Sequence, residues 1–223
     1  MLSLACHLAG AKEIVCTDYP SSDILRSIKR NVAINLLFRA RQKETEVSKD
    51  YVGNNDEVEG LVGVDMQLKR SGDVEAVLSA LSVSILGHRW GTFDENDQKL
   101  QKHSFDLVLA SDTLWLGEQH EALLSSMEYF LDKESPIAEA WVIAGFHTGR
   151  AKVLGFIDLV EEGCGGWEEK ESDNYGGYAG GLRLDTIWEI DVNGHTRDWA
   201  GERTSEGVTD RKRWCVVMVL KRR

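Results

Sequence analysis

Residues 105–115 read FDLVLASDTLW, and this stretch decides the fold that the sequence predicts. Residues 107–110 are apolar and rich in strand formers, which is typical of a strand buried on both faces. The run ends at Ser111 and Asp112. Open α/β sheets bind ligands at the carboxyl ends of their strands, so Asp112 is a candidate functional carboxylate. The alternative is that Asp112 only caps the turn and the helix that follow it.

A second acidic residue stands at the end of another strand. Residues 13–17, EIVCT, have the composition of a short buried strand, and Asp18 follows them. In Rossmann-like sheets the carboxylate after the second strand accepts hydrogen bonds from the hydroxyls of a ribose. The chain therefore has two acidic strand ends, and both are candidate site residues.

Helices and strands alternate along the chain. The spacing and composition of apolar residues predict helices over 22–37, 74–81, 118–131 and 150–162, and strands over 83–86, 141–146, 185–191 and 213–220. This alternation predicts an α/β fold with a mostly parallel sheet and an antiparallel C-terminal strand. We expect one domain over residues 1–223, in which residues 38–80 form a surface insertion because their periodicity is weak.

Composition excludes several classes of protein. The formal net charge of -11 argues against a nucleic-acid-binding protein, because neutralising phosphates requires clustered lysines and arginines. The four cysteines are scattered without a CxxC pair, so we expect no metal site and a reducing compartment. We also expect no membrane-spanning segment and no signal peptide, and hence a cytoplasmic protein, with the nucleus as the open alternative.

Two further residues follow predicted strands. Trp90 lies in the segment GHRWG after the strand at 83–86, where an indole could stack on a flat ligand; the alternative is that it only covers the edge of the sheet. His147 follows the strand at 141–146 and points toward the same end of the sheet as Asp112. It is either part of an acceptor pocket or an ordinary loop histidine.

Four motifs then occur in one order: LACHLAGAKEIVCTDYP, RNVAINL, SILGHRWG and FDLVLASDTLW. Together they resemble the class I, Rossmann-like S-adenosylmethionine-dependent methyltransferases, and within them the lysine-methyltransferase-like branch. This branch includes fungal nicotinamide N-methyltransferase-like proteins and the enzymes that methylate the N-terminus and a lysine of translation elongation factor. The later segments GFHTGRAK and RKRWCVVMVL are similar to the fungal members.

The resemblance implies which residues bind the cofactor. Asp18 would hold the ribose of S-adenosylmethionine, and Tyr19 would lie beside it. Trp90 and Gly91 match the Trp-Gly pair that packs near the adenine, and Ser111 matches a residue that faces the methionine portion.

The resemblance also implies the catalytic residues and the reaction. Methyl transfer from a sulfonium is a direct displacement, so the site must hold an unprotonated amine in line, shielded from water. Asp112 would orient that amine, and Trp115 would offer a π face to a cation. Trp115 stands where the family usually has Tyr or Phe, which keeps the aromatic wall but removes the phenol.

One family feature is missing from this sequence. The family places a turn, roughly Gly-x-Gly-x-Gly, between its first strand and the helix that corresponds here to residues 1–9. We therefore expect the first strand of the sheet to be lacking, its neighbours to have no ladder partner on that side, and cofactor affinity to be impaired. The opening in mid-helix predicts that an upstream segment has been lost.

The function implied by the resemblance is an S-adenosylmethionine-dependent N-methyltransferase of a protein amine, either a lysine or an N-terminus, with a translation factor as a candidate substrate. Two alternatives stay open. One is a nicotinamide-type methyltransferase of small heterocyclic amines, and the other is a truncated, non-catalytic protein of the same lineage that binds a protein partner.

Overall fold

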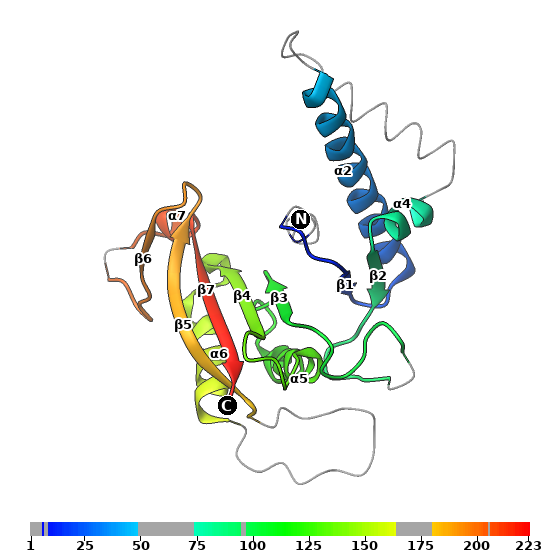
Figure 1. Cartoon of the computed structure of the whole chain (residues 1–223). Coiled ribbons are helices and arrows are strands. Elements are labelled where there is room, and N and C mark those ends of the chain that lie inside the picture. Colours follow the sequence, from blue (N-terminus) through cyan, green and yellow to red (C-terminus); the bar gives the residue numbers. More distant parts are fainter. Residues whose placement is uncertain (1–5, 7–8, 49–73, 95–96, 164–179, 205) are drawn as a thin grey trace. The chain divides into compact units, whose positions relative to one another are not determined.

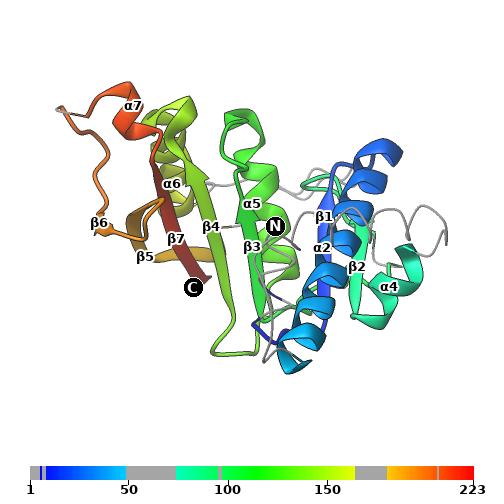
Figure 2. The ribbon, with the colours of Figure 1, turned by 90° about the horizontal axis from the view of Figure 1, so that it is seen from above.

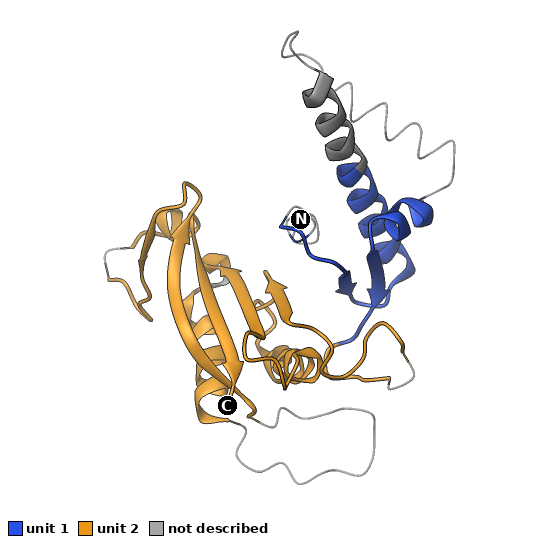
Figure 3. Ribbon diagram, viewed as in Figure 1, with its two compact units in different colours: residues 1–89 blue, residues 90–223 orange. Residues whose placement is uncertain are grey.

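The computed structural model describes residues 6, 9–48, 74–94, 97–163, 180–204 and 206–223. The chain divides into two compact units, residues 1–89 and residues 90–223 (Figure 3). The expectation of one domain stays a prediction. The helix predicted at the start of the chain lies almost entirely outside the described residues.

The first unit is a parallel strand pair covered by helices. Strand β1 (Ile14–Asp18) pairs with β2 (Val83–Gly87), and Asp18 stands opposite Gly87 at the carboxyl ends (Figure 1). Helices α2 (Ser22–Ser48) and α4 (Val74–Ala80) lie beside this pair (Figure 2). Parallel strands need a long crossover connection between them, and here that connection includes α2 and α4. The core of this unit holds Ile14, Val32, Ala33, Leu36, Leu78, Val83 and Ile85.

Helix α2 is longer than the sequence predicts. We expected it to end near residue 37, but it continues to Ser48, so residues 38–48 are helical instead of forming the start of a loop. The apolar stripe stops there, while Arg, Ala, Gln, Lys and Glu follow, and all of these favour helix. Extension of a formed helix fixes few dihedrals per hydrogen bond, so propensity alone sustains it. Residues 49–73 of the expected insertion lie outside the described residues.

The second unit contains a five-stranded sheet of order β3-β4-β7-β5-β6. Strands β3 (Leu107–Ser111) and β4 (Glu139–Gly145) are parallel. Strand β7 (Trp214–Arg222) is antiparallel to both β4 and β5 (Leu182–Asp191), between which it lies (Figure 1). The α/β class and the antiparallel C-terminal strand are thus confirmed. A short strand, β6 (Thr196–Asp198), was not predicted, and it pairs antiparallel with β5.

Two helices bury the apolar surface of this sheet. Helix α5 (His120–Phe130) follows a short 3₁₀ turn, η1 (Gly117–Gln119), and α6 (Arg150–Glu162) follows another, η2 (Phe146–Thr148). A last short helix, α7 (Val208–Arg211), precedes β7. The helices α5 and α6 and the central strands share one core whose members include Leu124, Met127, Phe146, Phe156, Val216 and Met218.

Four of the described strands are sheet edges with a single neighbour: β1, β2, β3 and β6. Among the described residues, β1 has β2 as its one sheet neighbour, and β3 has β4. The expectation that one strand of the family's sheet is lacking stays a prediction. None of the described helices combines the length and the apolar character that a membrane crossing requires.

Candidate active site

The end of β3 holds Asp112 in an unusual backbone conformation. Its φ angle is +54°, in the left-handed region, which costs an L residue roughly 1–2 kcal/mol and which Asp tolerates better than most residues. The backbone N–H of Asp112 donates to the carbonyl of Ile143 at 2.8 Å, and this bond secures the turn. The carboxylate itself is 67% exposed. The turn therefore presents the Asp112 carboxylate at the surface, as expected for a site residue.

His147 faces Asp112 from the next strand. Strands β3 and β4 are parallel, with Ser111 opposite Ile143, so the residues that follow them share one edge of the sheet. Nε2 of His147 lies 3.7 Å from Oδ1 of Asp112, within ion-pair distance when the imidazole is protonated. The predicted direction of His147 is thus confirmed.

Cys215 is a third group at this edge that sequence reasoning missed. It lies near the start of β7, opposite Gly145, and is partly buried. Burial raises the pKa of the Cys215 thiol, and the negative charge of Asp112 raises it further. The thiol is therefore protonated at neutral pH and is a poor nucleophile. Cys215 has no local signal that marks it as a site residue, because the pairing between β7 and β4 is a long-range event.

The segment after Asp112 is held by helix α5. Leu114 is buried, and its carbonyl lies 3.1 Å from Nε2 of the buried His120. Burial lowers the pKa of His120, so its imidazole is neutral near pH 7 and donates from Nε2. Leu114 is fixed in this way, and the next residue, Trp115, is 50% exposed. Its indole is therefore available to a ligand.

Thr113 carries a polar atom with no partner. Its Oγ1 is buried, and among the described residues it has no hydrogen-bonding group within reach. An unsatisfied buried hydroxyl typically costs about 1–3 kcal/mol. The unsatisfied hydroxyl of Thr113 lies directly after Asp112. Energetically costly features of this kind are found more often at functional sites than in ordinary turns.

Trp90 and Gly91 begin the second unit. Trp90 is partly buried and packs against the main core cluster, so it has a packing role. Part of its side chain remains accessible to a ligand. Gly91 has a φ of +76°, and its N–H donates to Oγ of Ser126 at 2.9 Å. A Cβ on Gly91 would lie 3.2 Å from Cβ of Ala122, so a side chain there would be strained by the backbone conformation and crowded by Ala122.

Asp18 and Tyr19 lie in the first unit, after β1. Oδ1 of Asp18 accepts a hydrogen bond from the N–H of Tyr19 at 2.7 Å, and its carbonyl accepts one from the N–H of His88 at 2.8 Å. Asp18 is exposed, and Oδ2 has no partner among the described residues. The Tyr19 ring is 58% exposed. The chemistry fits a ribose, because an exposed carboxylate oxygen remains available to its hydroxyls.

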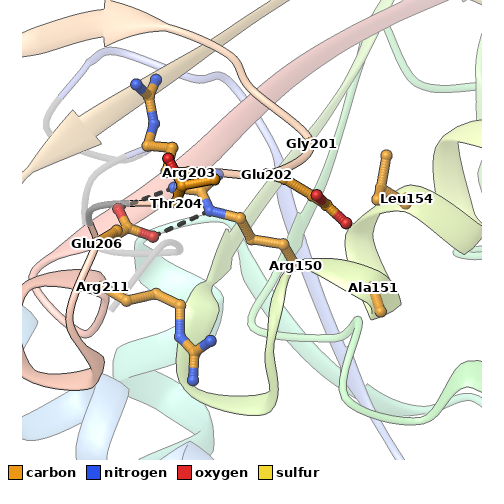
Figure 4. Close-up of a pocket in the computed structure, with 9 residues that line it drawn as sticks. All are labelled: Arg150, Ala151, Leu154, Gly201, Glu202, Arg203, Thr204, Glu206 and Arg211. Atoms are coloured by element: carbon orange, nitrogen blue, oxygen red, sulfur yellow. Dashed lines mark hydrogen bonds and ion pairs between the residues drawn. The ribbon is translucent and has the colours of Figure 1, made fainter.

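A cavity of about 300 Å³ lies beside α6 (Figure 4). Its walls come from the first turns of α6, from residues 201–204, and from Glu206 and Arg211. Arginines and glutamates both line it, so the lining favours no particular ligand charge. Within the described part of the chain, no group of His, Cys, Asp and Glu side chains could hold a metal ion.

Comparison with known proteins identifies relatives of this chain. No family model matches. The chain is 28% identical over 173 residues to a protein from Yarrowia lipolytica named protein N-terminal and lysine N-methyltransferase EFM7. That alignment covers 75% of this chain and 52% of the relative. Proteins of the same name from two strains of Cryptococcus neoformans are 23% identical over 223 residues, covering 92% of this chain and 60% of each relative.

The chain thus spans between about half and three fifths of the length of the curated relatives that it matches. The α/β sheet with its antiparallel C-terminal strand is consistent with a Rossmann-like methyltransferase fold. The chain is similar, at low identity, to the protein N-terminal and lysine N-methyltransferases named EFM7.

Proposed function

We propose that this protein is an S-adenosylmethionine-dependent N-methyltransferase whose acceptor is a protein amine, either a lysine side chain or an N-terminus. The observation that carries the proposal is the edge formed by β3 and β4, where Asp112, His147 and Trp115 stand exposed in a homologue of protein methyltransferases. We further propose a cytoplasmic location and a translation factor as substrate, as the family resemblance implies.

The relatives favour a protein acceptor. Their names state protein N-terminal and lysine methylation, and they lend no support to a small heterocyclic acceptor or to a non-catalytic protein. The half-exposed Trp115 and the exposed Asp112 are also open to a large partner, since neither side chain lies in a closed cavity.

The proposed catalytic residues orient the acceptor. The cofactor, when bound, supplies an electrophilic methyl group. Asp112 accepts a hydrogen bond from the amine and directs its lone pair, and His147, next to Asp112, takes up the proton that an arriving ammonium must lose. The Trp115 indole excludes water from one side and stabilises positive charge by a cation–π interaction.

The cofactor contacts that we propose are those that the family resemblance implies, and each unit is described by itself. In residues 1–89, Oδ2 of Asp18 accepts from the ribose hydroxyls and Tyr19 covers the sugar. In residues 90–223, the exposed part of Trp90 and the bare backbone of Gly91 contact the adenine, and Ser111 contacts the methionine portion.

The test is transfer of a labelled methyl group to a pool of cell proteins, followed by mass spectrometry of the labelled residue. We expect label on lysine or an N-terminal amine, lost in Asp112→Ala and kept in Asp106→Ala. Asp106 is a suitable control because it is an exposed carboxylate at the opposite end of the same strand. Label on nicotinamide instead of protein, or equal activity in both variants, would refute the proposal.

A further inference from the structure

Arg150, the first residue of α6, uses all of its side-chain donors. Nη1 donates to Oε1 of Glu189 at 2.7 Å and to the carbonyl of Ala200 at 2.8 Å. Nη2 donates to Oε2 of Glu189 and to Oε1 of Glu206, each at 3.0 Å, and Nε donates to Oε2 of Glu206 at 3.0 Å. A guanidinium has five N–H groups, so none is left unpaired. Figure 4 shows Arg150 between Glu206 and the start of α6.

The acids around Arg150 are ionised. Glu189 is fully buried, and burial alone would raise its pKa, but hydrogen bonds from Arg150 and Arg197 outweigh burial and hold the pKa below its usual value. Removing one partner of such a buried pair leaves an uncompensated buried charge, which strongly destabilises the fold. The cluster is therefore held in the geometry in which every charge is paired.

The flat face of Arg150 fixes a second group, Phe146. Cζ of Arg150 lies 4.0 Å from the centroid of the Phe146 ring and 5.5 Å from that of Trp199. Phe146 is fully buried, and its carbonyl accepts a hydrogen bond from the N–H of Gly149 at 3.0 Å. Phe146 and Arg150 therefore form the two ends of a closed turn.

His147 stands inside this turn. Its ring lies over Gly145, since a Cβ there would be 3.1 Å from Nδ1, while Nε2 is directed to Asp112 at 3.7 Å. The charged group facing it from β3 is Asp112, and Cys215 on β7 lies near the same carboxylate. The pair is too long for a hydrogen bond, so no direct bond fixes the distance between the half-exposed imidazole and Asp112, and the conformation of the turn matters for it.

We propose that Arg150 is a positioning residue: by fastening Phe146 and the start of α6, it holds the His147 imidazole against Asp112, where the pair meets the acceptor amine. That the pair meets the acceptor amine rests on the proposed function, whereas the placement of His147 against Asp112 does not. Arg150 touches neither Asp112 nor His147, and it acts through the turn that joins them.

Arg197 provides a matched control. It donates from Nε to Oε2 of Glu189 at 2.6 Å and from Nη2 to Oε1 of Glu206, and it stacks on Trp214, with Cζ 3.7 Å from the ring centroid. It thus shares both acids with Arg150, but its guanidinium stacks on Trp214, whereas that of Arg150 stacks on Phe146. Arg197→Lys disturbs the same buried charges without loosening the turn.

The test measures by NMR, in the full chain, how the chemical shifts of the His147 ring respond to a change at Asp112. The His147 signals are assigned by their loss in His147→Gln. Asp112→Asn should shift these signals in the parent and in Arg197→Lys, but much less in Arg150→Lys. Gly145→Ala, which pushes the ring directly, should also weaken the response. Glu206→Gln weakens the hydrogen bonds that Arg150 donates to Glu206, and it replaces Arg150→Lys in this test if Arg150→Lys does not fold.

Kinetics add a second measurement. We expect kcat to fall about tenfold or more in Arg150→Lys with KM for the methyl donor unchanged, because small misplacements of catalytic groups are costly. An undiminished response of His147 to Asp112→Asn in Arg150→Lys and in Glu206→Gln would overturn the proposal, as would equal losses in Arg150→Lys and Arg197→Lys. Inactivity of the parent chain would count against the proposed function alone, since the NMR experiment needs no turnover.

Discussion

The imidazole of His147 and the carboxylate of Asp112 face each other from the ends of two parallel strands, with Nε2 and Oδ1 3.7 Å apart. Each stands on a constrained turn: Asp112 has a left-handed φ, and His147 lies between the buried Phe146 and Arg150. Exposed side chains on rigid backbone are the arrangement that positions reacting groups without closing the site.

The first prediction concerns the charge of Asp112. Asp112→Asn should reduce methyl transfer about a hundredfold, because it removes the negative charge that orients the amine and leaves only a weaker, neutral acceptor. It should leave the free energy of unfolding nearly unchanged, since Asn also tolerates the left-handed φ of +54°. Initial rates and urea unfolding test this together. A large loss of stability would show instead that the carboxylate is mainly a structural cap.

The second prediction concerns Gly91. Gly91→Ala should destabilise the protein by more than Gly194→Ala, although both glycines have a positive φ, +76° and +85°. The added Cβ meets Ala122 at 3.2 Å in the first case, and nothing within 4 Å in the second. Gly194→Ala should therefore show the conformational cost of roughly 1–2 kcal/mol alone. Equal midpoints of thermal unfolding would contradict the close contact with α5.

The third prediction concerns the reactivity of Cys215. Its thiol should react slowly with iodoacetamide at neutral pH, because burial and the charge of Asp112 raise its pKa. Asp112→Asn removes the second cause, so the pH profile of alkylation should move to lower pH, whereas Asp106→Asn should not move it. Mass spectrometry of the modified peptide gives the rate, and identical profiles in all three proteins would rule out the electrostatic contact.

The fourth prediction concerns the hairpin between β5 and β6. Burial would raise the pKa of Asp191, but hydrogen bonds from the backbone and ring of His195 and from the N–H of Asn193 lower it from 3.8 to about 2. A lowered pKa in the folded state means that the ionised form stabilises the fold above pH 4, and that this contribution is lost as the pH falls toward 2. Asp191→Asn should flatten this part of the curve of unfolding free energy against pH. A curve as steep as that of the parent would show that other carboxylates are responsible.

Local pattern was sufficient for the class of fold and for most elements. The apolar runs at 83–86 and 213–220 became β2 and β7, and the stripe at 150–162 became α6 with the predicted bounds. These elements depend on periodicity and composition within a few residues, which any sequence displays directly. The exposed ends of β1 and β3 were visible for the same reason, since an acidic residue follows each apolar run.

The pairings that make the candidate site depend on tertiary structure. Asp112 and His147 meet because Ser111 stands opposite Ile143, and Cys215 joins them because β7 inserts antiparallel beside β4. The five bonds of Arg150 draw on Glu189, Ala200 and Glu206, none of which has a local signal marking it as a partner. Register and burial of charge are set by contacts between residues distant in the chain, so only the folded structure brings these groups together.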